Sequence, residues 1–236
     1  MGTMAVNYLW ISKEGVPSTI PSFLFYRLQQ NTQNYKNDAK FTLWLNNFSS
    51  VGNYRIPPNL SIRNVEELPP LSPLGQAATI EGDFWIHIDR LKLQIVAETL
   101  KQNPTIPSAL FTDLDIPDIR LNDTALQQRL QSYGMAFGAT FLKDSKGRIH
   151  IKDRYENGYM AFSQTSLSTL EHMIHHMKDY RMADRHTIFW AIHNFMDIYA
   201  RKQGISSWMD SIGRLPVQPP CNDHSHLPYE QAERHT

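Results

Sequence analysis

Asp113 and Asp115 are the residues of this sequence whose types and spacing most directly indicate chemistry. They follow the apolar run 109–112 and precede Pro117, so two carboxylates stand where a buried strand is expected to end. On an extended backbone, residues two positions apart point to the same side of a strand. Two anions held this close repel each other unless a cation lies between them, and carboxylate oxygens suit a hard divalent cation. The pair therefore favours a metal site, with a solvated turn as the alternative.

The elements that would position this pair alternate between strands and helices. Hydrophobic runs and turn signals predict strands over 6–11, 41–45, 60–63 and 109–112, a helix opening at Pro21 and Ser22, and another over 84–100. This order favours an α/β fold with parallel strands joined by right-handed crossovers. Ligands of such sheets gather at the carboxyl ends of the strands. Trp10 stands at one such end and offers an aromatic face either to a flat ligand or to the core.

Charged residues near the start of the expected helix 84–100 are a further candidate group. Asp89, Arg90 and Lys92 interrupt its apolar stripe. Such charges ordinarily form a solvated face. At the active edge of the sheet, however, Arg90 or Lys92 would be able to reach a diphosphate or a sugar hydroxyl.

The rest of the chain supplies more polar groups. After the aspartate pair we expect a helix over 124–130, strands over 135–142, 149–151 and 159–162, and two helices, the second of which ends at Gly204. Asn157 lies in a polar trio beside the last of these strands. The segment 205–236 differs in composition and is expected to be irregular, lying over the active face of a single catalytic domain, 4–204. Its Asn222, Asp223 and His224 form either a metal-ligand group or a solvated tail.

Two histidines at helical spacing, His172 and His176, resemble a zinc pair. Met173 stands where the metalloprotease pattern needs Glu, so we disfavour zinc here.

Composition limits the class of protein. The 236 residues are 41% hydrophobic and 19% charged, which is typical of a globular chain. Lys+Arg and Asp+Glu are equal at 23 each, so no nucleic-acid partner is indicated. One cysteine excludes an internal disulfide framework. No run predicts a transmembrane segment or signal peptide. We therefore expect a cytoplasmic protein, or one exported without a cleaved signal.

The order of these features resembles a family. An opening Tyr-Leu-Trp-Ile strand at 8–11, a Leu-Trp-Leu strand ended by Asn46, a charged helix, Asp-x-Asp at 113–115 and Glu-Asn-Gly at 156–158 are together similar to the DXD-containing glycosyltransferases of the A-type fold. The similarity is greatest to the large clostridial toxin glucosyltransferase domains, related bacterial effectors and DXD sugar-binding mannosyltransferases. The resemblance implies one Rossmann-like domain with a mixed, mostly parallel central sheet flanked by helices.

The resemblance also implies roles for individual residues. Trp10 would stack on the donor's base, and Asp113 and Asp115 would hold Mn²⁺ or Mg²⁺ and, through it, the diphosphate and sugar. An Asp and an Arg three positions apart would contact the donor sugar. This sequence can be aligned with that pair in two ways. Arg90 fits only with His87 in the Asp position, and Asp89 fits only with Lys92 in the Arg position. The remaining implied contacts with donor or metal are Asn157, a lid residue Trp208, and a ligand from Asn222, Asp223 or His224.

The implied activity is transfer of a hexose from a nucleotide-sugar donor, with a UDP-sugar favoured, to an acceptor that is a protein, a glycan or a lipid. We expect retention of configuration, because no convincing base is found for inversion. Two alternatives remain. One is a nucleotide-sugar-binding relative without turnover, favoured because the stretch 103–107 replaces the family's Gly-Gly lead-in. The other is a phosphatase of the haloacid dehalogenase type, disfavoured by Pro117 and by the mid-chain position of the motif.

Overall fold

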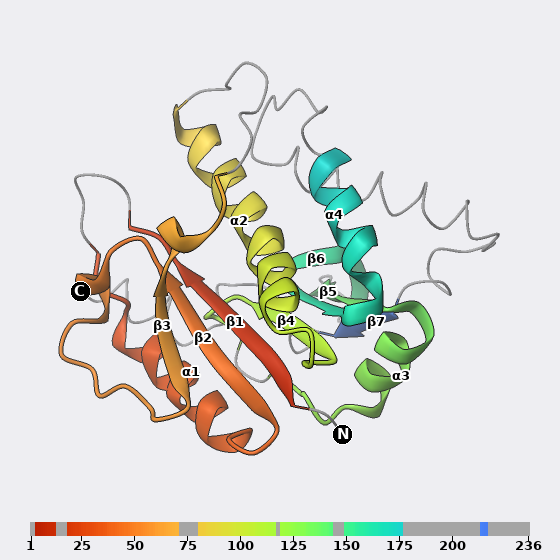
Figure 1. Cartoon of the computed structure of the whole chain (residues 1–236), viewed down its shortest axis with the longest axis horizontal. Helices are drawn as coiled ribbons and strands as arrows, with labels where there is room; N and C mark the ends of the chain where they lie inside the picture. The colour runs from red at the N-terminus through yellow and green to blue at the C-terminus, as the bar shows by residue number, and fades with distance from the viewer. Residues whose placement is uncertain are drawn as a thin grey trace.

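The computed structural model describes residues 3–12, 18–70, 80–116, 119–143, 149–176 and 213–216. Within these residues seven strands form one sheet in the order β3-β2-β1-β4-β6-β5-β7 (Figure 1). The strands are β1 Met4–Trp10, β2 Ala39–Leu45, β3 Leu60–Asn64, β4 Ser108–Thr112, β5 Met135–Lys143, β6 Ile149–Ser163 and β7 Gly213–Pro216. The helices are α1 Ser22–Asn34, α2 Ile80–Gln102, α3 Thr124–Tyr133 and α4 Leu167–His176, with short 3₁₀ turns η1 Phe48–Val51, η2 Val65–Glu67 and η3 Gln164–Ser166.

The sheet is mixed and mostly parallel. β1 pairs in parallel with β2 and β4, and β2 pairs in parallel with β3. β6 is antiparallel to both β4 and β5, whereas β7 is parallel to β5. The predicted α/β class, with helices flanking a mostly parallel sheet, is confirmed. Because β3, β2, β1 and β4 run in one direction, their carboxyl ends share one edge of the sheet.

Helices cover both faces of this sheet. α2 and α4 lie on one face, while α1 lies behind the parallel strands on the other (Figure 1). Successive residues of a strand point to opposite faces. Accordingly, Ala109 and Phe111 of β4 pack in the core with α2 and α4, whereas Leu110 packs in the core with α1 and α3. Both faces of β4 are buried, which explains why its sequence is a continuous apolar run.

A buried amide fixes the middle of the sheet. Asn7 of β1 is 1% exposed, and its Oδ1 accepts hydrogen bonds from Nε1 of Trp44 on β2 (3.1 Å) and from Oγ1 of Thr99 on α2 (3.1 Å). Its Nδ2 donates to the carbonyl O of Leu110 on β4 (3.3 Å). One side chain thus ties three neighbouring strands to α2.

Two sequence-based expectations about strands were wrong. The separate strands expected over 149–151 and 159–162 are one continuous strand, β6, because shifts in the β5–β6 register between Phe137 and Phe141 absorb the polar trio without ending the strand. In the segment 205–236, expected to be irregular, Gly213–Pro216 form β7, because the edge of β5 offers unpaired backbone groups for it to pair with. The rest of that segment, and the helix expected to end at Gly204, lie outside the described residues. No helix in the described part of the chain is long and apolar enough to cross a membrane.

Candidate functional site

The predicted site residues Trp10 and Asp113 lie at the same edge of the sheet. Trp10 is the last residue of β1, and Asp113 follows the last residue of the adjacent parallel strand β4. Asn46 follows β2, the other neighbour of β1. This is the edge at which α/β folds bind ligands.

The exit from β1 is held by a polar clamp. Asn46 donates from Nδ2 to the carbonyl O of Ser12 (2.8 Å), and its Oδ1 accepts from the backbone N–H of Ser12 (2.9 Å). The hydroxyl of Ser12, which is buried, lies 2.9 Å from that of Ser50. The indole N–H of Trp10 donates to the carbonyl O of Ser18 (3.1 Å), and the half-buried ring packs on the α1 side of the sheet. The position of Trp10 is therefore fixed by its surroundings, and stacking on a base stays a prediction.

The aspartate pair lies on a turn, which corrects the expectation of an extended backbone. β4 ends at Thr112, and the backbone N–H of Ile116 donates to the carbonyl O of Asp113 (3.2 Å). Leu114 and Ile116 are 5% and 2% exposed in the core shared with α1, so their burial draws the chain into the turn. The backbone N–H of Asp113 donates to the carbonyl O of Gly158 on β6 (2.8 Å), which anchors the start of the turn.

A lysine on α2 contacts the first aspartate. Nζ of Lys92 lies 3.0 Å from Oδ1 and 3.1 Å from Oδ2 of Asp113. It also lies 3.5 Å from Oδ1 of Asp89, one turn earlier on the same helix. The ammonium of Lys92 also lies over the ring of Phe111, with Nζ 5.6 Å from the ring centroid. The sequence left two candidate pairs for the donor sugar, Asp89 with Lys92 and His87 with Arg90. The structure places Lys92 of the first pair in contact with Asp113.

The alternative pair, His87 and Arg90, lies on the same helix. Arg90 is 6% exposed, and burial lowers the pKa of its guanidinium. Burial, and then the charge of Arg90, lower the pKa of His87. Arg90 is therefore a second positive charge in the first half of α2, whereas the lowered pKa disfavours the charged form of His87. The role of this pair toward a donor sugar stays a prediction.

Arg27 of α1 contacts the same turn from the opposite face of the sheet. The sequence did not predict this role. Nη1 of Arg27 donates to the carbonyl O of Asp115 (2.8 Å), and its guanidinium lies 5.9 Å from the ring centroid of Phe23. The only sequence signal for this role is a cation placed between the buried Leu24 and Leu28 of α1. Such a signal identifies a half-buried arginine but not its partner.

The other predicted site residues divide into two groups. Asn157 is half-buried on β6, next to the Gly158 whose carbonyl accepts from Asp113, and its role toward a donor stays a prediction. The second group lies outside the described residues and consists of Trp208, Asn222, Asp223 and His224.

The chemistry of the described side chains suits a hard cation. Carboxylate oxygens are the ligands that Mg²⁺ and Mn²⁺ prefer. The ammonium of Lys92 already lies between the carboxylates of Asp89 and Asp113, so these side chains bind a cation in this structure. Among the described residues, no group of three or more His, Cys, Asp or Glu forms a complete metal centre. Asp113 and Asp115 would therefore need oxygens from a donor, from water or from elsewhere in the chain to complete coordination.

No family model matches the chain, and no relative is found among curated proteins. Solved structures are similar in chain trace. A 4-diphosphocytidyl-2C-methyl-D-erythritol synthase from Anaerococcus prevotii has a TM-score of 0.49 at 9% identity, over 100% of this chain and 97% of that chain. A second such synthase has a TM-score of 0.45 at 8% identity, over 99% and 98%. A glycosyltransferase involved in the glycosylation of the major capsid of PBCV-1 has a TM-score of 0.42 at 10% identity, over 91% and 82%. At these values the likeness concerns the chain trace and not the site.

Proposed function

We propose that the chain is a metal-dependent glycosyltransferase that moves a hexose from a nucleotide-sugar donor to an acceptor, with retention, and that the donor is a UDP-sugar. The observation that carries the proposal is the turn holding Asp113 and Asp115 at the carboxyl end of β4. It is fixed from one face of the sheet by Arg27 and from the other by Lys92. A carboxylate pair fixed at this edge is suited to hold a cation and, with it, a diphosphate.

The proposed chemistry requires positive charge at the leaving group. A nucleoside diphosphate leaves readily only when its developing negative charge is neutralised, and a bound Mn²⁺ or Mg²⁺ supplies that charge as a Lewis acid. Asp113 and Asp115 would hold the ion. Trp10, at the end of the neighbouring strand β1, would stack on the base. Both positions lie at the carboxyl ends of adjacent strands, which supports assigning them to one ligand.

The remaining assignments belong to the same proposal. Asp89 or Arg90 of α2 would contact the donor sugar, and Asn157 of β6 would contact the donor beside the turn. Residues of the segment 205–236 would cover the site, with Trp208 as a lid and Asn222, Asp223 or His224 as a further metal ligand. The acceptor would be a protein, a glycan or a lipid. If the chain is an exported bacterial effector, the acceptor would be a protein of another cell.

A second candidate is a relative that binds nucleotide-sugars without turning them over. One observation favours it: both carboxylate oxygens of Asp113 already contact the ammonium of Lys92. A site whose metal ligand is neutralised in this way would need its lysine displaced before catalysis.

The test is hydrolysis of a panel of UDP- and GDP-hexoses with Mn²⁺ or Mg²⁺, because many such enzymes slowly transfer the sugar to water and no acceptor need be known. The wild type and Asp115→Ala are compared, each with and without a chelator. Release of nucleotide from one donor, lost with the chelator and with the substitution, is the expected result. Binding of nucleotide without release from any donor would favour the second candidate. Neither binding nor release would contradict both.

A further inference from the structure

The ammonium of Lys92 is shared by two anions at the carboxyl edge. Both oxygens of Asp113 lie within 3.1 Å of Nζ, and Oδ1 of Asp89 lies 3.5 Å away. The side chain of Lys92 is 9% exposed, whereas that of Asp113 is 36% exposed. The carboxylate of Asp113 therefore faces solvent on one side and is held by a largely buried cation on the other.

The charges of this cluster do not suit a diphosphate as they stand. Asp89 and Asp113 contribute two carboxylates, against which Lys92 contributes one ammonium, and Asp115 adds a further carboxylate to the same turn. The ammonium is also directed at Asp113 and not at solvent. Like charges at short range repel, so an incoming diphosphate meets an excess of negative charge near the turn. A divalent cation at Asp113 would remove that excess.

A divalent cation and the ammonium of Lys92 cannot both remain in contact with Asp113 without cost. A metal ion coordinates carboxylate oxygens at about 2.0–2.6 Å, closer than any ammonium approaches. Its charge would repel an Nζ lying within hydrogen-bond distance of the same two oxygens. Lys92 has a flexible four-carbon stem, so its ammonium is able to move while its helix stays in place.

We infer that Lys92 exchanges between two anions: it neutralises Asp113 in the absence of a divalent cation, and binds the diphosphate of a nucleotide once that cation occupies Asp113. The inference rests on the proposed function, because it assigns Lys92 to the same donor site. Lysine binds phosphate as a point charge, so no fixed fork geometry has to be met after the movement. Metal and nucleotide binding are then coupled through a single side chain.

If Lys92 makes this exchange, removing its ammonium should change the affinities for the metal ion and for the nucleotide in opposite directions. Without Lys92, a divalent cation no longer competes for Asp113 and binds more tightly. Without Lys92, a nucleoside diphosphate loses a charge-assisted contact and binds more weakly, even when the metal site is full. A lysine that only held the fold together would weaken both, and one with no role at the site would change neither.

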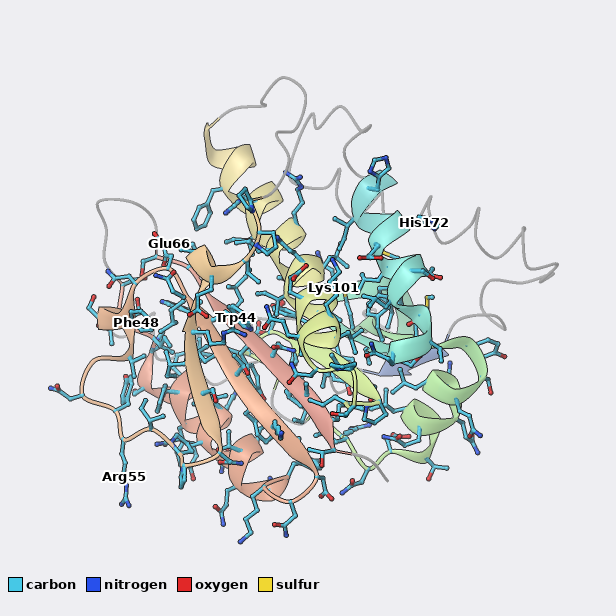
Figure 2. The ribbon with its side chains drawn as sticks, viewed as in Figure 1. Trp44, Phe48, Arg55, Glu66, Lys101 and His172 are labelled. Carbon is cyan, nitrogen blue, oxygen red and sulfur yellow. The ribbon has the colours of Figure 1, made fainter. Side chains whose placement is uncertain are left out.

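Lys101 provides a matched control on the same helix. It lies near the carboxyl end of α2 (Figure 2), with Nζ 3.0 Å from Oε1 of Glu98 and 2.9 Å from Oε1 of Glu171 on α4. Like Lys92, it pairs with a carboxylate three residues earlier and with a second one on another element. Lys92→Met and Lys101→Met therefore make the same change of charge and shape, and differ in their distance from the turn.

The experiment measures two affinities for each variant. Binding of Mn²⁺ alone is followed by the electron paramagnetic resonance of the free ion, and binding of UDP and of GDP at saturating Mn²⁺ is followed by calorimetry. For Lys92→Met we expect Mn²⁺ to bind about tenfold more tightly and the preferred nucleotide about tenfold more weakly, the change that one charge-assisted contact produces. Lys101→Met should match the wild type in both. Lys92→Gln, which keeps a polar end group, replaces Lys92→Met if the latter does not fold.

The outcomes separate this inference from the proposed function. If Lys92→Met matches the wild type in either titration, or loses both affinities, the exchange is wrong. The proposed donor site still stands in that case, provided that Asp113→Asn weakens both ligands. If neither Mn²⁺ nor nucleotide binds the wild type, the exchange and the proposed function both fail.

Discussion

Arg27 donates a 2.8 Å hydrogen bond from Nη1 to the carbonyl O of Asp115, and so links α1 to the turn that follows β4. Lys92 of α2 contacts Asp113 at the other end of the same turn. The two cations approach from opposite faces of the sheet. The turn that carries the two carboxylates is therefore held by both helical layers and not by the strand alone.

Arg27→Met should loosen the turn while leaving the fold intact. The variant loses one charge-assisted hydrogen bond, so we expect a loss of unfolding free energy of about 1–2 kcal/mol. Donor hydrolysis should fall about tenfold in kcat/KM, because the carboxylates are no longer held in place. Gln29→Met is the control, since Gln29 lies on the same helix and donates to the carbonyl O of Arg55 (2.9 Å), away from the turn. Equal effects of the two variants on kcat/KM would refute a positioning role for Arg27.

Asn46→Ala should disturb the nucleotide end of the site. It removes both hydrogen bonds to the backbone of Ser12, which fix the chain just after Trp10. We expect a loss of stability of about 1–3 kcal/mol and weaker binding of UDP and GDP. Asn47→Ala removes a neighbouring amide that caps η1 by accepting from the backbone N–H of Ser49 (3.0 Å). This control should lose about 1 kcal/mol and keep its nucleotide affinity, and a shared loss of affinity would argue against the clamp.

Asn7→Ala should be among the more destabilising substitutions in the sheet. It leaves the buried indole N–H of Trp44 and the hydroxyl of Thr99 without their acceptor, and removes the donor to Leu110. The expected loss is about 2–4 kcal/mol, measured by urea unfolding with an unchanged m-value. Thr99→Val removes one donor only and should lose about 1 kcal/mol. A stability of Asn7→Ala within about 0.5 kcal/mol of the wild type would show that the amide is not the centre of this network.

Glu67 should contribute a small acid-sensitive part of the stability. Its carboxylate accepts from the backbone N–H of Asn64 (2.9 Å) and from Nε of Arg63 (2.8 Å), and these contacts, the backbone one first, lower the pKa of Glu67 below the usual 4.5. The folded state therefore holds the proton less readily than the unfolded state. The stabilisation is present above pH 4.5 and is lost as the pH falls through the lowered pKa. The pair is exposed, so the effect is below about 1 kcal/mol.

Glu67→Gln tests the direction of this pH dependence of stability. The wild type should be more stable than the variant at neutral pH, and the difference should shrink as the pH falls from 6 toward about 3. Chemical unfolding across that range measures it. A difference that grows on acidification would reverse the assignment.

The sheet was predictable because its strands are short apolar runs that end at recognisable breakers. β2 ends before Asn46, and β4 ends before Asp113. The sequence predicted both strand ends, and it also predicted that they lie on the same side of the sheet. The turn itself was less visible. Leu114 and Ile116 alternate with the two aspartates, which resembles a strand, and only their packing under α1 shows that the chain bends.

The contacts of the site depend on tertiary structure and leave little trace in the sequence. The sequence offered Lys92 or Arg90 as a contact for a diphosphate or a sugar. Periodicity places Lys92 on α2 but cannot say that it meets Asp113. Arg27 lies far from Asp115 in the chain, and no local pattern connects them. The continuity of β6 was missed for a related reason, since a polar trio normally breaks a strand, whereas here Glu156 pairs with Gly138 of β5.

The most direct test of the account is the rate of nucleotide release from the preferred donor by Asp113→Asn. Asp38→Asn is the control, since Asp38 precedes β2 at the opposite edge of the sheet and is exposed. With Mn²⁺ present, we expect release by Asp113→Asn to fall at least about a hundredfold, because the carboxylate that would hold the ion is lost. Asp38→Asn should match the wild type. Release by Asp113→Asn at the wild-type rate would contradict the placement of the active site at the carboxyl end of β4.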